Sequence, residues 1–139
     1  MKLKQRHQKR PSPREKYGFT VFLTGLPGSG KTTIARVLSA KLVAIDSRPV
    51  TMIDGDELRK TCSRNLGFSK KDREINVRRA GAIAKEITKN GGIAICSLIA
   101  PFEASRRANR EMISRYGGYV EVYVSTPVHV CEARDKKGL

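Results

Sequence analysis

Short apolar runs alternate with longer stretches of helical character along most of the chain. The apolar runs predict four buried strands, at residues 19–24, 50–53, 93–99 and 119–124. Between them we predict helices at residues 32–42, from Ser69 to the Gly91-Gly92 pair, from Pro101 to about Tyr116, and from Pro127 onward. Because strands alternate with helices, we expect a three-layer α/β fold with a mostly parallel sheet.

Ligand-binding residues of such a sheet are expected at the carboxyl ends of its strands. Gly25, Asp54, Ile99 and Ser125 each end or directly follow a predicted strand, so four loops should meet at one edge. Residues 1–17 are too polar to pack. We expect a basic N-terminal tail or linker there, followed by one domain at residues 18–139.

The chain is strongly basic, with 28 Lys and Arg against 13 Asp and Glu and a formal net charge of +15. Residues 1–16 hold seven of the basic side chains and one acid, so the rest of the chain is basic too. This charge fits a solvated surface and a nucleic-acid partner equally well. Against the second interpretation, no basic stretch has interleaved aromatic residues, and aromatic content is only 6%.

Other bulk features bear on the compartment. No apolar run approaches the roughly 20 residues of a membrane span, and the charged N-terminus lacks the apolar stretch of a secretory signal. Cys62, Cys96 and Cys131 are widely spaced, which suits neither a disulfide framework nor a zinc site. We therefore expect a cytoplasmic protein.

The loop after the first strand carries the strongest chemical signal. Residues 25–32 read Gly-Leu-Pro-Gly-Ser-Gly-Lys-Thr and match the phosphate-binding pattern G-x-x-x-x-G-K-[ST] at every fixed position. A strand before the loop and a helix after it allow backbone N–H groups to cradle phosphates. Lys31, expected at an exposed loop end, would reach the β- and γ-phosphates, and Thr32 would ligate Mg²⁺. We therefore expect nucleoside triphosphate binding; the alternative is a glycine-rich turn with a chance Lys-Thr.

Two carboxylates follow the second strand. Asp54 and Asp56 could bind Mg²⁺ through water or take a proton from an attacking hydroxyl. They could equally form only a turn and a helix N-cap, a position that Asp serves well.

The predicted helix from Ser69 brings further candidates. Arg73 and Asn76 share a helical face and could bind an anion or a base edge. The adjacent Arg78 and Arg79 point in different directions and are expected in solvent. Phe68 could be a hydrophobic staple or a stacking platform for a base, and its place before the helix favours the staple.

Together these residues resemble the adenylylsulfate kinase family, and the resemblance runs from Gly18 to Leu139. The phosphate loop alone is shared by many NTPases, but the later motifs in this order are specific. They are residues 54–59 (Asp-Gly-Asp-Glu-Leu-Arg), 65–69 (Asn-Leu-Gly-Phe-Ser), 72–79 (Asp-Arg-Glu-Ile-Asn-Val-Arg-Arg) and 131–139 (Cys-Glu-Ala-Arg-Asp-Lys-Lys-Gly-Leu). The resemblance implies a P-loop NTPase fold of the nucleoside-monophosphate-kinase type, with a kinase domain at residues 18–139.

The resemblance also implies an activity in sulfate assimilation. ATP would phosphorylate the 3′-hydroxyl of adenosine 5′-phosphosulfate (adenylylsulfate), with Mg²⁺ as cofactor. Lys31, Asp54 and Asp56 would be catalytic, and Thr32 and Asp54 would hold the metal. The implied ATP-binding residues are Gly25, Gly28, Ser29, Gly30, Lys31, Thr32, Thr33 and Arg134. The implied acceptor-binding residues are Asp56, Arg59, Phe68, Arg73, Asn76, Ile99 and Ala100, with Phe68 stacked on the adenine.

Two departures from the family pattern matter. Many members carry serine at the position of Ala100, where a phosphoserine intermediate has been proposed, so we expect direct transfer in this chain. The family also continues past Leu139 into a basic lid and a last strand, which we expect to be absent here.

The implied partner is the small molecule adenylylsulfate, with neither nucleic acid nor membrane. A homodimer is open, and so is fusion to or association with an ATP sulfurylase, because the tail through Tyr17 resembles the junction found in such fusions. Two alternative functions stand beside this one. The first is another small-metabolite or nucleoside P-loop kinase, against which Phe68, Arg73 and Asn76 argue. The second is a non-catalytic, ATP-dependent nucleic-acid-binding module, which the net charge favours.

Overall fold

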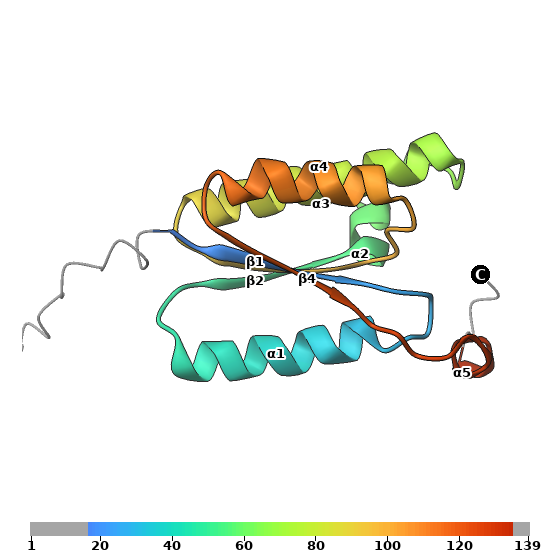
Figure 1. Ribbon diagram of the computed structural model, residues 1–139, viewed down its shortest axis with the longest axis horizontal. Helices are drawn as coiled ribbons and strands as arrows, with labels where there is room; N and C mark the ends of the chain where they lie inside the picture. The colour runs from blue at the N-terminus through green and yellow to red at the C-terminus, as the bar shows by residue number, and fades with distance from the viewer. Residues whose placement is uncertain (1–16, 135–139) are drawn as a thin grey trace, which may run out of the picture.

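Four parallel strands form the centre of the structure, and helices lie on both faces of their sheet (Figure 1). The computed structural model describes residues 17–134. The strands are β1 (Phe19–Thr24), β2 (Val50–Asp54), β3 (Ile93–Leu98) and β4 (Gly118–Tyr123), in the spatial order β2-β3-β1-β4. Every neighbouring pair is parallel, which confirms the predicted fold class. Residues 1–16 of the expected tail (residues 1–17) and the motif residues after Arg134 lie outside the described residues.

The helices form two layers. In Figure 1, α1 (Lys31–Ile45) lies below the sheet, while α3 (Lys70–Lys89) and α4 (Glu103–Ser114) lie above it. Two short helices, α2 (Gly55–Lys60) and α5 (Val128–Arg134), follow β2 and β4. The sequence did not predict α2 as a helix, because its 6 residues are too few to show a period.

The loop after β3 differs from expectation at both ends. β3 ends at Leu98, so Ile99 belongs to the loop. α4 begins two residues later than the proline signal predicted, because the N-cap residue Phe102 is extended, with φ −100° and ψ 123°. The Arg106 guanidinium donates a 2.6 Å hydrogen bond to the Ala100 carbonyl, which ties the extended segment to the first turn of α4.

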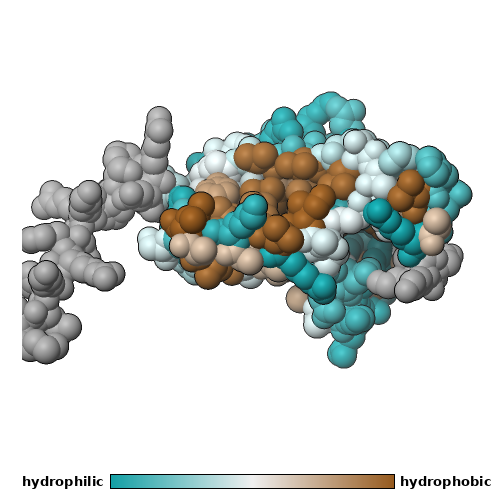
Figure 2. Space-filling model, turned by 90° about the horizontal axis from the view of Figure 1, so that it is seen from below, coloured by the Kyte–Doolittle hydropathy of each residue, from teal (hydrophilic) through white to brown (hydrophobic). Residues whose placement is uncertain are grey.

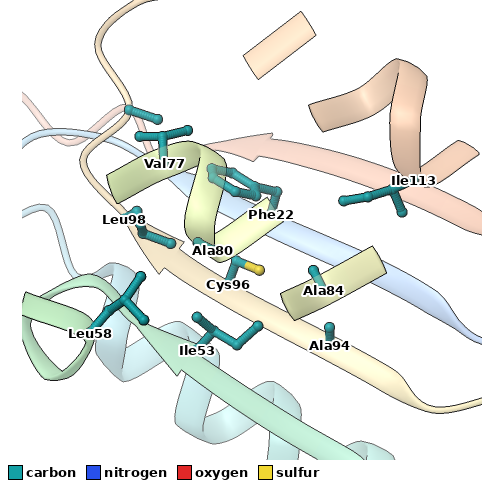
Figure 3. Close-up of a cluster of buried hydrophobic side chains, with 11 residues drawn as sticks. Phe22, Ile53, Leu58, Val77, Ala80, Ala84, Ala94, Cys96, Leu98 and Ile113 are labelled. Carbon is teal, nitrogen blue, oxygen red and sulfur yellow. The ribbon is translucent and has the colours of Figure 1, made fainter. Parts of the chain in front are cut away.

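Side chains alternate along the strands and build an apolar cluster on each face of the sheet. On the α3 side, Phe22, Cys96 and Leu98 pack with Ala80 and Ala84 (Figure 3). The cluster on the α1 side contains Val21, Leu23, Ala35, Ile93 and Ile95. All 6 residues of β3 are buried, because β3 has a strand on each side and helices on both faces.

Polar groups hold α3 in place against its neighbours. Gly81 of α3 lies directly against the carboxamide of Asn109 on α4. The Asn109 Nδ2 donates a 3.0 Å hydrogen bond to the Val77 carbonyl of α3. Near the other end of α3, the buried hydroxyls of Thr88 and Thr20 are hydrogen-bonded at 2.7 Å, which joins α3 to β1.

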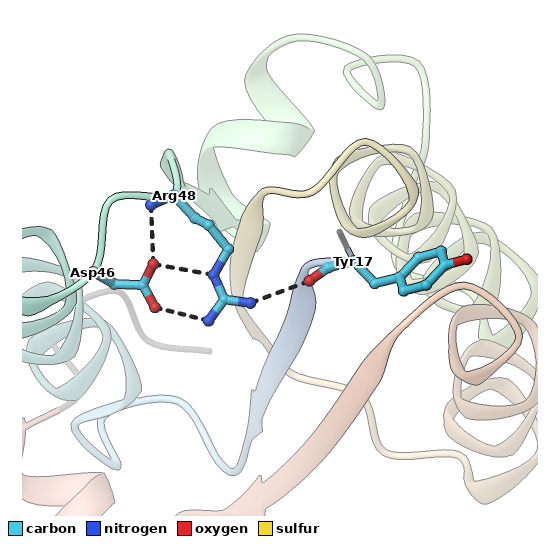
Figure 4. A network of polar contacts seen from close by, with 3 residues as sticks. All are labelled: Tyr17, Asp46 and Arg48. Carbon is cyan, nitrogen blue, oxygen red and sulfur yellow. Dashed lines mark hydrogen bonds and ion pairs between the residues drawn. The ribbon is translucent and has the colours of Figure 1, made fainter. Parts of the chain in front are cut away.

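Hydrogen bonds from one arginine, Arg48, join the segment before β1 to the segment before β2 (Figure 4). Arg48 donates from Nε and Nη2 to the Asp46 carboxylate, at 3.0 and 2.7 Å, and from Nη1 to the Tyr17 carbonyl, at 3.1 Å. Its guanidinium also lies over the Phe19 ring, 5.0 Å from the centroid. The hydrogen bonds from Arg48 hold the pKa of the Asp46 carboxyl below its usual value. This contact fixes the amino ends of the strands, opposite the edge where ligands are expected.

Apolar side chains remain exposed on the α1 side of the molecule (Figure 2). α1 packs against β1, β2 and β3, and only Lys31 and Ala35 of this helix are buried. The exposed apolar residues on this side include Ile34, Val37, Val43 and Ile45 of α1 and Val120 and Val122 of β4. Among the described residues, none of the helices combines the length and apolar character needed to cross a bilayer.

The close contact between Gly81 and Asn109 yields a first prediction. In Gly81→Ala the new Cβ overlaps the Asn109 carboxamide, so urea denaturation should show a loss of about 1–3 kcal/mol in the free energy of unfolding. In the background of Asn109→Ala the same change should be neutral or stabilising, because alanine is favoured over glycine inside a helix by about 0.5–1 kcal/mol. Equal effects of Gly81→Ala in both backgrounds would show that the two helices do not meet at this point.

Candidate active site

The phosphate loop joins β1 to α1 at the carboxyl edge of the sheet. Its backbone requires glycine at Gly28 and Gly30, where φ is +78° and +100°. A side chain at Gly28 would also collide with the Cys131 carbonyl of α5, 2.7 Å away. Gly30 is the N-cap of α1, and no side chain among the described residues caps this helix. The N–H groups of its first turn are therefore open to an anion, and the helix dipole favours one there.

Lys31 is the first residue of α1 and is only 8% exposed. The expectation that it sits at an exposed loop end is therefore wrong: the loop folds back over it, and its Nζ donates a 2.8 Å hydrogen bond to the Leu26 carbonyl. Burial lowers the pKa of the Lys31 ammonium from its usual value, and the carboxylates of Asp56 and Asp54 partly oppose this shift. A phosphate group in the loop would stabilise the charged form of Lys31, which burial disfavours.

Asp54, the last residue of β2, contacts Thr32 in the first turn of α1. The Thr32 Oγ1 donates a 3.2 Å hydrogen bond to Asp54 Oδ2. The other carboxylate oxygen, Oδ1, accepts a 2.8 Å hydrogen bond from the Asp56 N–H and caps α2. Asp54 is thus the helix N-cap that the sequence allowed, and it is also next to the phosphate loop. A hydroxyl and a carboxylate are oxygen ligands of the type that Mg²⁺ prefers, and Mg²⁺ needs only one or two from protein because it retains several waters.

The predicted acceptor residues come together around the loop between α2 and α3. Arg59 Nη1 donates a 2.9 Å hydrogen bond to the Gly67 carbonyl, and its guanidinium lies 4.7 Å from the centroid of the Phe68 ring. Arg73 Nε donates a 2.9 Å hydrogen bond to the Phe68 carbonyl. Asn76, one turn further along α3, is only 5% exposed, and its Oδ1 has no hydrogen-bond partner among residues 17–134.

Phe68 is not a hydrophobic staple. A staple packs the residue before the N-cap against the fourth residue of the helix. Here Ser69 is the N-cap, the fourth helical residue is Arg73, and the Phe68 side chain is 61% exposed. The Phe68 ring instead contacts the Arg59 guanidinium and keeps its other surface open to solvent.

Arg79 corrects another expectation. Its Nη1 donates hydrogen bonds to the Cys62 carbonyl, at 2.7 Å, and to Ser63 Oγ, at 3.2 Å, so this arginine is not simply solvated. The Asp72 carboxylate accepts from the Gly67 N–H at 2.8 Å. These contacts fix the loop at both of its ends.

The two remaining strand ends also reach this edge. Ile99 is 37% exposed beside the buried Ala100, which offers no hydroxyl. After β4, Thr126 Oγ1 donates a 2.6 Å hydrogen bond to the Ser29 carbonyl of the phosphate loop. Arg134 belongs to α5, which packs on Gly28. The predicted ATP-binding residue Thr33 is exposed on the first turn of α1.

Sequence reasoning missed the buried hydroxyl of Ser97 at this edge. It named Ser29, but not that the buried Ser29 hydroxyl has no hydrogen-bond partner among residues 17–134. Ser97 sits inside an otherwise apolar run, so the signal for it was a single polar residue at a strand end. A hollow of about 410 Å³ lies elsewhere, on α3, and is lined mainly by Lys71, Glu74, Ile75 and Arg78. It contains none of the phosphate-loop residues, so its size does not identify the site.

Comparison with known proteins adds the family context. The family model described as adenylylsulphate kinase matches residues 17–139. An adenylyl-sulfate kinase of Halothermothrix orenii is 45% identical over 126 residues, which are 91% of this chain and 66% of that protein. A sulfate adenylyltransferase of Gibberella zeae is 45% identical over 132 residues, which are 95% of this chain but only 23% of that protein.

Solved structures of APS kinases also resemble this chain. The APS kinase of Mycobacterium tuberculosis, solved with AMPPNP and APS, superposes with a TM-score of 0.81 at 35% identity, covering 88% of this chain and 70% of that one. A hexameric APS kinase of Thiobacillus denitrificans superposes with a TM-score of 0.74 at 56% identity, covering 80% of this chain and 22% of that one.

The exposure of Phe68 gives a second prediction, on stability. Phe68→Ala should lower the free energy of unfolding by less than about 1 kcal/mol, because it removes little more than an exposed cation–π contact. Leu58→Ala serves as the control: Leu58 is 6% exposed in the core beside α2, and its truncation should cost about 2–5 kcal/mol. A cost for Phe68→Ala similar to that of Leu58→Ala, measured by urea denaturation, would restore the staple interpretation.

Proposed function

The chain belongs to the adenylylsulfate kinase family, and on this basis we propose that it transfers the γ-phosphoryl group of ATP to the 3′-hydroxyl of adenosine 5′-phosphosulfate. The products are 3′-phosphoadenylylsulfate and ADP. The observation that carries the proposal is the 3.2 Å contact between Thr32 and Asp54 beside the buried Lys31. It brings two oxygen ligands for Mg²⁺ and the ammonium group of Lys31 together at the uncapped N-terminus of α1.

On the donor side, the loop residues and the first turn of α1 cradle the ATP phosphates. Lys31 exchanges its hydrogen bond to the Leu26 carbonyl for one to the β- and γ-phosphates. Thr32 and Asp54 hold Mg²⁺, which when bound neutralises charge on the phosphate oxygens. Arg134, beside Gly28 on α5, lies against the ATP adenine.

On the acceptor side, the open surface of Phe68 stacks on the adenine of adenylylsulfate. Arg59 and Arg73, which flank this ring, bind the phosphosulfate, and Ile99 and Ala100 complete the acceptor site. The unpartnered Oδ1 of Asn76 accepts a hydrogen bond from the acceptor. Binding thereby satisfies a buried oxygen that has no hydrogen-bond partner within the described part of the chain.

The two aspartates divide the chemistry between them. Asp54 is already engaged with Thr32, so we assign it to the metal. Asp56, two residues further on, orients the 3′-hydroxyl and takes its proton. As the 3′-oxygen bonds to the γ-phosphorus, the bond to the β,γ-bridging oxygen breaks and its electrons leave with ADP. Ala100 has no hydroxyl to form a phosphoenzyme, so the transfer is direct.

The proposal extends to an upstream partner. The chain spans 22–23% of the length of two fungal relatives named sulfate adenylyltransferase, against 66% of the adenylyl-sulfate kinase of Halothermothrix orenii. We propose that adenylylsulfate is supplied by a sulfurylase, either in the same chain or in an associated one. The hexameric relative supports an oligomeric setting for the domain.

Calorimetry and a coupled ADP-release assay test the function. The chain should bind ATP with Mg²⁺ and adenylylsulfate, and release ADP with adenylylsulfate but not with other nucleosides or with oligonucleotides. Lys31→Ala should lower the rate about 10²–10³-fold, by analogy with the loss of one preorganised donor. Lys41→Ala, at an exposed position on the same helix, is the control and should leave the rate unchanged. Near-normal turnover in Lys31→Ala would exclude the assignment.

A separate prediction distinguishes the two substrate sites. Phe68→Ala should weaken adenylylsulfate binding by about 1–3 kcal/mol if the ring stacks on the base, with the ATP affinity unchanged. Phe68→Tyr keeps the stacking surface and should bind both ligands normally. If calorimetry instead shows that ATP affinity falls in Phe68→Ala, then the donor and acceptor sites are wrongly assigned.

A further inference from the structure

Ser97 has a buried hydroxyl that the fold does not use. Its side chain is 4% exposed, and Oγ has no hydrogen-bond partner among residues 17–134. An unsatisfied buried polar group typically costs about 1–3 kcal/mol, so its presence in a strand of otherwise apolar residues calls for an explanation. The other β3 residues are Ile93, Ala94, Ile95, Cys96 and Leu98.

A structural hydroxyl in this sheet behaves differently. Thr20 of β1 is also buried, and its Oγ1 is hydrogen-bonded to Thr88 Oγ1 at 2.7 Å. That pair ties a strand to a helix and leaves neither hydroxyl without a partner. Ser97 makes no comparable contact, so packing alone would be served better by alanine.

The strand register shows which group Ser97 can serve. Ser97 is the in-register partner of Asp54 on β2 and of Leu23 on β1, so it lies between the strand that ends in Asp54 and the strand that leads into the phosphate loop. Alternation along β3 places it on the α1 face with Ile93 and Ile95, and Asp54 is on the same face.

The N-terminus of α1 meets the sheet at this point. Thr32, in its first turn, donates its hydrogen bond to the Asp54 carboxylate from the same side. Ser97 is therefore next to Asp54 on the face of the sheet from which Thr32 contacts that carboxylate, beside the metal site proposed above. This inference rests on that proposed site.

Mg²⁺ retains several of its water ligands in proteins, and a metal-bound water is a hydrogen-bond donor that needs a fixed acceptor. Loss of a group that holds the ligands of a metal in place typically weakens metal binding by about 10-fold or more. A serine hydroxyl can accept from such a water and at the same time donate to a carboxylate. The water would then satisfy the accepting function of the hydroxyl, and the carboxylate would satisfy its donating function.

We propose that Ser97 is a positioning residue of the magnesium–nucleotide site, whose Oγ accepts a hydrogen bond from a magnesium-bound water and donates one to the Asp54 carboxylate. Ser97 touches neither ATP nor the acceptor. Its effect is on the orientation of Asp54 and of the hydrated metal, and therefore on the metal dependence of nucleotide binding.

The test is a titration of the chain with a fluorescent ADP analogue at a series of Mg²⁺ concentrations. In Ser97→Ala the Mg²⁺ concentration that gives half of the metal-dependent gain in affinity should rise about 3–10-fold, the effect of one lost hydrogen bond. Affinity for the analogue in EDTA should stay within about twofold. Ser97→Thr retains the hydroxyl and should restore the wild-type midpoint.

Stability separates this role from a structural one. Without ligand, Ser97→Ala should be at least as stable as the wild type to urea, because it removes an unsatisfied group. Thr88→Ala is the opposite control: it breaks the pair with Thr20, so it should lower stability and leave the Mg²⁺ midpoint unchanged. An unchanged midpoint in Ser97→Ala, or an equal loss of affinity in EDTA, overturns the proposal while the kinase assignment stands. A wild-type chain that shows no Mg²⁺-dependent binding overturns both.

Discussion

The in-register pairing of β3 with both β1 and β2 is the constraint on which the rest of the site depends. It aligns Thr24 with Leu98 and Asp54 with Ser97, so the phosphate loop, the aspartate and the loop at Ile99 begin at one level. A slip of β3 by one residue would turn Ser97 to the opposite face of the sheet, away from α1, and would bring a different residue beside Asp54. The burial of all 6 residues of β3 between two strands and two helical layers makes such a slip costly. The hydrophobic pattern of a single strand therefore determines where the polar groups meet.

That pattern explains what the sequence could predict. The sequence marks the strands by four apolar runs, and it marks the phosphate loop by the spacing of its glycines. The bounds of all four strands and the first residue of α1 therefore lie within a residue or two of the predicted positions. α2 is too short for a period, and it depends on the Asp54 cap, which local sequence allows but does not require. The burial of Lys31 could not be predicted because it follows from the path of the loop, which brings the Leu26 carbonyl to the ammonium.

The arginines illustrate the same limit. Sequence placed Arg73 on a useful helical face and Arg79 in solvent, but both donate to main-chain carbonyls of the loop between α2 and α3. Arg59 does the same at Gly67. Long side chains of this kind select partners by tertiary proximity, which no helical spacing encodes. The result is a loop held by guanidinium groups rather than by an apolar core, with Phe68 displayed on its surface.

The helix that begins at Lys31 has a further consequence, because it is at once the proposed phosphate-binding element and the long helix with the fewest buried residues. Only its first residue and Ala35 are buried, while Val37, Val43 and Ile45 face solvent. Local opening is cheapest where few apolar contacts are lost, so amide hydrogens of α1 should exchange earlier than those of α3. A ligand that binds at the N-terminus of α1 would oppose such opening, at a cost to its binding free energy. Affinity and helix order are thereby coupled, and a stabilising change on the distant face of α1 would strengthen binding without touching the nucleotide.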